Sequence, residues 1–87
     1  MDFEFDPVKS ASNLVKHGID FTEAQQLWLD QNRLEVRART QDEPRWLLIA
    51  SYNSRFWSAV FTYRPDRIRI ISVRRARQKE ITLYEDQ

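Results

Sequence analysis

Four strand-like runs separated by short turns occupy most of residues 34–74 and constrain the fold of this chain most strongly. Residues 34–38 alternate apolar and charged side chains, and more apolar or aromatic runs follow at residues 46–51, 56–63 and 67–74. The expected turns are residues 41–44, Asn53-Ser54 and Pro65-Asp66. Because such short connections only join antiparallel neighbours, the sequence predicts an antiparallel sheet of about four strands.

The sequence also predicts helices, two before the strands of this meander and one after them. Asp6 and Pro7 suit the start of a helix over about residues 7–17, and the only glycine, Gly18, suits its end. A second helix is expected over about residues 21–30 and a last one over about residues 76–85, while residues 2–5 suit a short strand. The expected order is β-α-α-β-β-β-β-α, an α+β domain whose two N-terminal helices and C-terminal helix cover one face of the sheet. Apolar residues recur at helical spacing in the first helix: Val8, Ala11, Leu14 and Val15.

Positive charge is concentrated between Arg64 and Lys79. This stretch holds six arginines and one lysine against one acid, a local net charge of +6, whereas the whole chain carries +1. Because isoleucine and valine are interleaved with the arginines, we expect an ordered strand here rather than a loose basic tail. A guanidinium binds phosphate through two parallel hydrogen bonds and stays charged, so RNA or another polyanion is the leading candidate partner.

Length and composition exclude several other classes of protein. The 87 residues make one domain, 1–87. Without cysteine there can be no disulfide and no thiolate metal site, and the single His17 excludes a pair of catalytic histidines and a multi-histidine metal site. We see no signal-peptide pattern and no apolar run of about 18 residues, so we expect a soluble cytoplasmic protein with no cofactor and no membrane contact.

Two blocks of the sequence resemble the BrnT toxins of bacterial type II toxin–antitoxin systems. Phe3 to Ala24 reads F-x-F-D-P-x-K-x-x-x-N-x-x-K-H-G-I-x-F-x-E-A, and Asp66 to Glu85 reads D-R-I-R-I-I-S-V-R-R-A-x-x-x-E-x-x-x-Y-E. The resemblance implies one BrnT-like domain with a small RelE-like fold, and inhibition of translation by RNA cleavage. It also implies neutralisation by a BrnA-like antitoxin with a ribbon-helix-helix domain, through which alone the complex would contact DNA.

Cleavage of RNA without a metal uses the neighbouring 2′-hydroxyl as nucleophile. It needs a base, an acid and cationic donors for the charged transition state. Arg74, inside the I-S-x-R part of the second block, is the expected main donor, with Arg64 from the preceding strand as its companion. Arg67, Arg69 and Arg75 would share one face of the strand and Arg74 the other. The alternative for Arg74 is an ion pair with an acid of the last helix, Glu80 or Glu85.

His17 and Tyr84 complete the predicted catalytic set. His17, within K-H-G, is a candidate general acid–base, or else it caps the last carbonyls of its helix. Tyr84 could position a phosphate or share proton transfer, as a tyrosine does in RelE-like enzymes, or it packs with its hydroxyl at the rim. Trp46 or Trp57 could stack on a base, with core packing as the alternative. The residues expected to bind RNA are Lys16, Arg67, Arg69, Arg75, Arg77 and Trp57.

Three functions are compatible with these features. The first is a metal-independent endoribonuclease toxin silenced by an antitoxin. The second is a module that binds RNA or a partner without cleaving anything. The third is a heterodimer subunit whose arginines serve only the protein interface.

Overall fold

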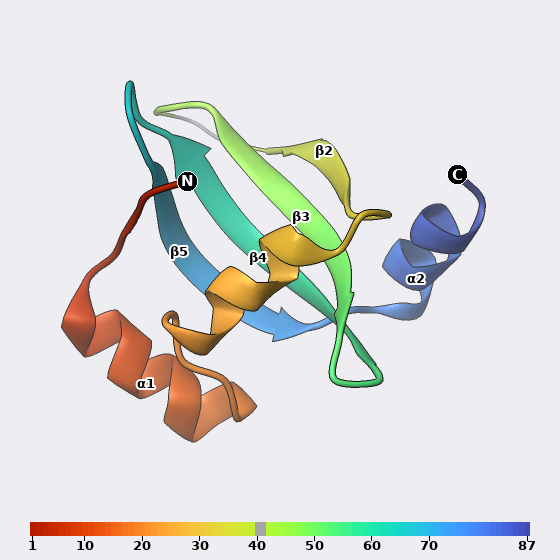
Figure 1. The fold of residues 1–87 in the computed structure, drawn as a ribbon, viewed down its shortest axis with the longest axis horizontal. Coiled ribbons are helices and arrows are strands. Elements are labelled where there is room, and N and C mark those ends of the chain that lie inside the picture. Colours follow the sequence, from red (N-terminus) through yellow and green to blue (C-terminus); the bar gives the residue numbers. More distant parts are fainter. Residues whose placement is uncertain (40–41) are drawn as a thin grey trace.

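The computed structural model describes residues 1–39 and 42–87, in which helices flank one five-stranded sheet (Figure 1). The predicted order of elements is confirmed. The predicted turn at residues 41–44 begins at Gln41, which lies outside the described residues. The elements are β1 (Phe3–Glu4), α1 (Pro7–His17), the 3-10 helix η1 (Glu23–Leu29), β2 (Leu34–Ala38), β3 (Arg45–Tyr52), β4 (Arg55–Tyr63), β5 (Ile68–Arg75) and α2 (Gln78–Glu85).

The sheet is mixed, and the prediction of a purely antiparallel sheet of about four strands is therefore wrong in part. Strands β2 to β5 form the predicted antiparallel meander, and Asn53 and Ser54, with φ angles of 55° and 63°, make the tight turn between β3 and β4. β1 adds a fifth strand parallel to β5, with Phe3 opposite Ile68. A parallel pair needs a long connection, and here all the other strands lie between its two members in the sequence.

A β-bulge interrupts β5 at Ile71. Val60 of β4 lies opposite Ser72, whereas the next residue, Phe61, lies opposite Ile70, so Ile71 is the extra residue. An extra residue reverses the alternation of side chains along the rest of the strand.

The bulge changes which arginines share a face. Arg69 lies on the same face of the sheet as Arg74, whereas Arg75 lies on the opposite face. The predicted grouping of Arg67, Arg69 and Arg75 on one face is therefore wrong.

The core lies between η1 and one face of the sheet, which we call the inner face. Trp28 of η1 packs edge-to-face on Phe61, with ring centroids 5.2 Å apart, and on Phe3 at 5.1 Å. Burying a large side chain of this kind stabilises the fold by about 1.5–3 kcal/mol. The inner face contributes Leu48, Ala50, Trp57, Ala59, Phe61, Ile68, Ile70 and Val73 to the core.

The second predicted helix is a 3-10 helix rather than an α-helix. The Glu23 N–H at its start donates to Asp20 Oδ1 at 2.8 Å, which fixes the chain just before the helix, and the chain leaves the helix at Asp30 in an extended conformation. The Asp30 carboxylate accepts the Ser51 N–H of β3 at 2.8 Å, which holds the end of η1 against the sheet. Only seven residues connect these two fixed ends, and a 3-10 helix covers more distance with them than an α-helix would, because it rises about 2.0 Å rather than about 1.5 Å per residue.

α1 attaches to the sheet through polar side chains. Asn13 Nδ2 donates to the carbonyls of Val73 and Ile19 at 2.9 and 2.8 Å, and Asn13 Oδ1 accepts the Val73 N–H at 3.1 Å. Ser10 Oγ accepts the Phe21 N–H at 2.9 Å. The Asn13 amide therefore bonds the backbone of β5 as a further strand would, beyond the point where β1 ends.

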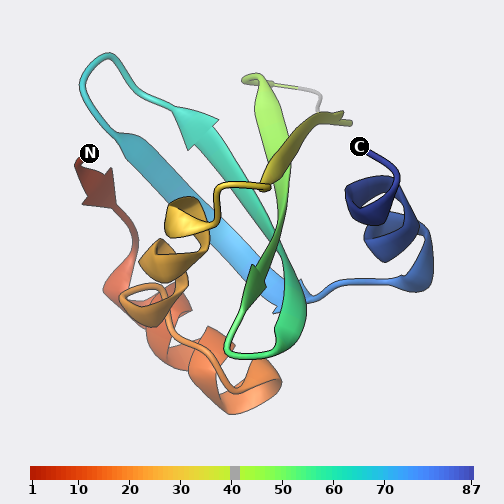
Figure 2. The same ribbon diagram turned by 45° about the vertical axis from the view of Figure 1, so that its right-hand side comes forward.

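α2 lies against the other, outer face of the sheet, so the prediction that all helices cover one face is wrong (Figures 1 and 2). Glu80 of α2 accepts a hydrogen bond from Ser58 Oγ at 2.8 Å, and Ser58 alternates with core residues of the inner face. The helix begins at Gln78 rather than at Ala76, because the Ala76 N–H still bonds the Phe56 carbonyl of β4 at 3.0 Å.

Candidate functional site

A pocket of about 200 Å³ lies where α1 meets the bulged part of β5. Two lysines and the only histidine of the chain open onto it, and none of the lining residues in the described part of the chain is acidic. A phosphate can enter such a pocket without meeting a carboxylate. The lining residues are Lys9, Ser12, Asn13, Lys16, His17, Phe21, Ile71 and Ser72.

The helix geometry of α1 brings the basic side chains together. Lys9, Asn13 and Lys16 follow each other at i, i+4 and i+7, so they lie along one stripe of the helix. The hydrogen bonds of buried Asn13 fix that stripe against β5. His17 is the last residue of the helix, and Gly18, in the left-handed conformation with φ 78°, ends the helix just after it. The predicted Lys16 and His17 are therefore neighbours in one exposed site.

Ser72 connects this pocket to Arg74. Both side chains lie on the outer face, two residues apart, which corresponds to about 7 Å along a strand. Ser72 is exposed and lines the pocket together with His17. His17 thus shares a pocket with Ser72, and Arg74 lies two residues further along β5, outside the lining of that pocket.

Arg74 is held by a bidentate ion pair. Its Nη1 and Nη2 donate to Glu80 Oε1 and Oε2, both at 2.8 Å, and Nη1 also donates to the Arg75 carbonyl at 3.2 Å. The hydrogen bonds from Arg74 lower the pKa of Glu80 to about 2, and the pKa of Arg74 is raised by the same contact. The ion pair with an acid of the last helix, which the sequence offered as the alternative to a catalytic Arg74, is therefore present. It leaves two of the five guanidinium N–H donors, on Nε and Nη2, without a partner among the described residues.

The three arginines nearest the β4–β5 turn form a separate cluster around Glu4. Arg69 Nη1 lies 2.7 Å from Glu4 Oε2, and the Nε atoms of Arg64 and Arg67 lie 3.9 and 3.8 Å from the same carboxylate. Arg64 also donates to Glu43 Oε2 at 2.9 Å. Their charge is largely matched by carboxylates of the chain itself.

Arg64 does not accompany Arg74, contrary to expectation. The turn that carries Arg64 follows the pair Tyr63 and Ile68, whereas Arg74 lies opposite Ser58. Six residues of strand separate the two positions, about 20 Å. Two side chains at the opposite ends of a hairpin cannot bind one phosphate.

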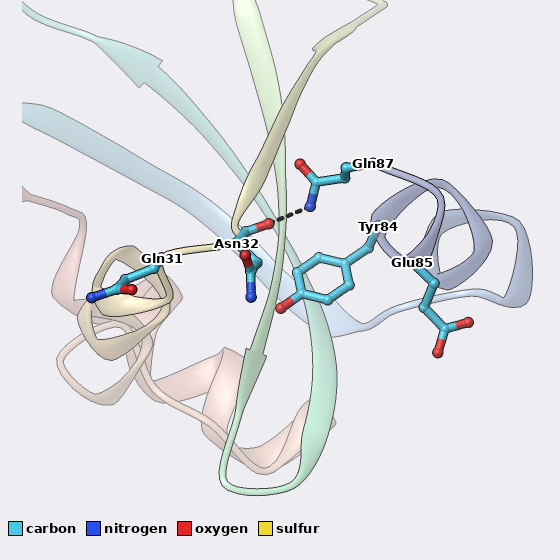
Figure 3. A pocket seen from close by; sticks show the side chains of 5 residues that line it. All are labelled: Gln31, Asn32, Tyr84, Glu85 and Gln87. Carbon is cyan, nitrogen blue, oxygen red and sulfur yellow. Dashed lines mark hydrogen bonds between the residues drawn. The ribbon is translucent and has the colours of Figure 1, made fainter.

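Tyr84 lies on α2 one helical turn after Glu80, the ion-pair partner of Arg74, and its ring packs on Phe56 with centroids 5.3 Å apart. Its hydroxyl donates to Asp30 Oδ2 at 2.7 Å, and burial together with this bond raises the pKa of Tyr84 to about 12. Figure 3 shows its ring reaching from α2 toward Asn32, in a second pocket of about 360 Å³ that shares no residue with the first. There the Gln87 side-chain amide donates to the Asn32 carbonyl, and the pocket contains the carboxylate of Glu85. The Tyr84 hydroxyl is therefore engaged with Asp30, and a role of Tyr84 in catalysis stays a prediction.

Trp57 is a core residue, only 5% exposed, so it offers no face to a nucleotide base and the packing alternative holds. The Arg75 guanidinium lies over its ring, 5.6 Å from the centroid. Trp46 is half-buried under Arg37 in the same way, at 5.1 Å. Arg77 is exposed at the start of α2.

Only Lys16 and His17 of the first pocket were predicted from the sequence as site residues. Six other lining residues were not: Lys9, Ser12, Asn13, Phe21, Ile71 and Ser72. Lys9 carried a usable signal, because it shares the spacing i, i+4, i+7 with Asn13 and Lys16. Ser72 lies inside the I-S-x-R motif, but its place beside α1 depends on the bulge and on the packing of the helix.

Within residues 1–39 and 42–87, no three His, Cys, Asp or Glu side chains gather in a way that would hold a metal ion. None of the helices in these ranges has the length and apolarity needed to cross a bilayer.

Fold and site together define a small α+β protein with a cationic, acid-free pocket at the edge of its sheet. Residues 5–80 match the family described as the ribonuclease toxin, BrnT, of type II toxin–antitoxin systems. The match covers most of the chain, which therefore belongs to this family and confirms the resemblance. Among curated proteins, none matches the chain.

Proposed function

We propose that this protein is a metal-independent endoribonuclease toxin that inhibits translation in the cytoplasm, and that it cleaves RNA in the pocket between α1 and β5. The supporting observation is the gathering of Lys9, Lys16 and His17 around Ser72, with Arg74 two residues further along β5. The whole chain, residues 1–87, acts as one toxin domain.

The reaction is an internal transfer at phosphorus. The 2′-oxygen attacks the adjacent phosphate, the bond from phosphorus to the 5′-oxygen breaks, and the products carry a 2′,3′-cyclic phosphate and a 5′-hydroxyl. The neutral imidazole of His17 accepts the proton of the 2′-hydroxyl. Because the chain has only one histidine, the proton for the departing 5′-oxygen comes from a second donor, the Lys16 ammonium or water.

The cations of the site stabilise the charge that develops on the phosphate oxygens. Arg74 reaches the phosphate with the N–H donors that Glu80 leaves open, and Glu80 fixes the orientation of its guanidinium plane. Lys9 and Lys16 supply point charges from the other side of Ser72. Loss of one such donor typically slows a reaction about 100- to 1,000-fold.

Neutralisation is assigned to a BrnA-like antitoxin with a ribbon-helix-helix domain, and the complex contacts DNA only through that partner. Support comes from membership of a type II toxin–antitoxin family and from the sequence resemblance on which that antitoxin type rests.

Incubation of the purified protein with RNA in the presence of EDTA tests this proposal. We expect fragments that end in a 2′,3′-cyclic phosphate and begin with a 5′-hydroxyl, at a rate that the chelator does not change. Cleavage that stops in EDTA and returns with Mg²⁺ would contradict it. Intact RNA with a salt-dependent mobility shift would instead identify a non-catalytic binding module.

A further inference from the structure

α1 has a surface that neither the core nor the pocket uses. Val8 and Val15, seven residues apart, are 77% and 87% exposed, and Ala11 is exposed between them. At 3.6 residues per turn these three side chains form one stripe, on the opposite side of the helix from Ser10 and Asn13.

The exposure of this stripe is enforced by the fold. A helix of a soluble protein normally turns its apolar residues toward the core, yet the buried side chains of α1 are polar Ser10 and Asn13. Their hydrogen bonds to the backbone of Phe21, Ile19 and Val73 fix the rotation of the helix. The valines cannot turn inward without breaking these bonds. A persistent apolar stripe at the surface is a mark of a protein interface.

Charge indicates what covers the stripe. Residues 7–17 contain Lys9, Lys16 and His17 and no acidic residue. Each lysine follows one of the valines by one residue, so it lies about 100° further around the helix, on the flank between the stripe and the side that Asn13 attaches to β5. A second copy of the chain would bring lysines against lysines, which is unfavourable, whereas a partner segment with carboxylates beside its apolar side chains complements the surface.

We propose that the outer stripe of α1 is the docking site of the antitoxin. An amphipathic segment of the antitoxin covers Val8, Ala11 and Val15, and its acidic side chains pair with Lys9 and Lys16. Because both lysines also line the pocket, the docked segment takes the cations that RNA needs, and antitoxin and RNA exclude each other. This inference rests on the proposed toxin function.

Single charge substitutions in the stripe test the docking site. The variants are Val8→Glu and Val15→Glu, with Leu29→Glu on η1 as the matched control, because Leu29 is also apolar and 72% exposed. An acid in the first turn of a helix is favourable, so Val8→Glu keeps the helix intact. The probe is a purified BrnA-like antitoxin with a ribbon-helix-helix domain, titrated by calorimetry. We expect Kd to rise more than about tenfold for either valine variant and less than about twofold for Leu29→Glu.

RNA cleavage by the free variants separates this inference from the proposed function. Both valine variants should cleave RNA like the wild type but escape neutralisation by the probe. Unchanged Kd and full neutralisation of both would overturn the docking site. A dimer of the chain alone that Val15→Glu dissociates would also overturn it, because the stripe would then be a self-interface. If the wild type cleaves no RNA, the proposed function fails, while the titration still decides where the partner binds.

Discussion

Asn13 attaches a helix to a sheet edge through one side chain. Replacing it with leucine would leave the N–H and carbonyl of Val73 and the carbonyl of Ile19 without their partner. Each unsatisfied buried group costs about 1–3 kcal/mol, so we expect Asn13→Leu to lower the free energy of unfolding by about 3 kcal/mol or more. Denaturant unfolding measures this, with Gln26→Leu at an exposed position as the control. Equal stability of the two variants would contradict the role given to Asn13.

The Tyr84 hydroxyl connects α2 to the end of η1 through its hydrogen bond to Asp30. We expect Tyr84→Phe to lose about 1 kcal/mol of stability, because the bond to Asp30 disappears, and to keep the wild-type rate of RNA cleavage. A hydroxyl whose pKa is raised to about 12 is a poor proton donor near neutral pH. Thermal melting and a cleavage assay on the same preparation check both expectations. A large loss of cleavage in a folded variant would restore Tyr84 to the active site.

At the scale of elements, α2 is anchored to the sheet by the pair of Arg74 and Glu80. If this pair served stability alone, Arg74→Gln and Glu80→Gln would affect cleavage alike. Because we assign Arg74 to the transition state, we expect Arg74→Gln to slow cleavage about 100-fold or more, while Glu80→Gln stays within about tenfold of the wild type. Single-turnover rates measure the difference, and parallel losses would reject the assignment.

The same pair makes the stability of the protein depend on pH. Hydrogen bonds from Arg74 lower the pKa of Glu80 from 4.5 to about 2. A depressed carboxyl pKa contributes stability that is complete above about pH 4.5 and is lost as the pH falls toward 2. We expect Glu80→Gln to be on the order of 1–2 kcal/mol less stable than the wild type at neutral pH, with the gap closing in this window. Thermal denaturation across the window measures it, and a gap that persists at pH 2 would contradict the linkage.

At the scale of the whole molecule, the sequence predicted what short-range interactions decide. Gly18 ends α1 and Asn53 turns the β3–β4 hairpin because their neighbours in the chain suffice for those conformations. The parallel pairing of Phe3 with Ile68 and the bulge at Ile71 depend on segments far apart in the sequence. No local pattern specified them.

The residues of the candidate site also include some that local sequence motifs predict and others that only the fold brings together. The sequence predicts His17 and Arg74 because each lies in a motif, whereas the position of Ser72 beside α1 follows only from the fold. The sequence predicts Arg64 as the companion of Arg74 because the two lie on adjoining strands of one hairpin. The length of β5 separates the two ends of that hairpin.

The central claim is that RNA is cleaved in the pocket between α1 and β5 and not at the arginine cluster of the β4–β5 turn. The most direct test compares single-turnover cleavage of one RNA by the wild type, His17→Gln and Arg64→Gln, with folding checked by circular dichroism. We predict a loss of about 100-fold or more for His17→Gln and a rate within about threefold of the wild type for Arg64→Gln. Wild-type cleavage by folded His17→Gln, or loss of cleavage in Arg64→Gln alone, would contradict the account.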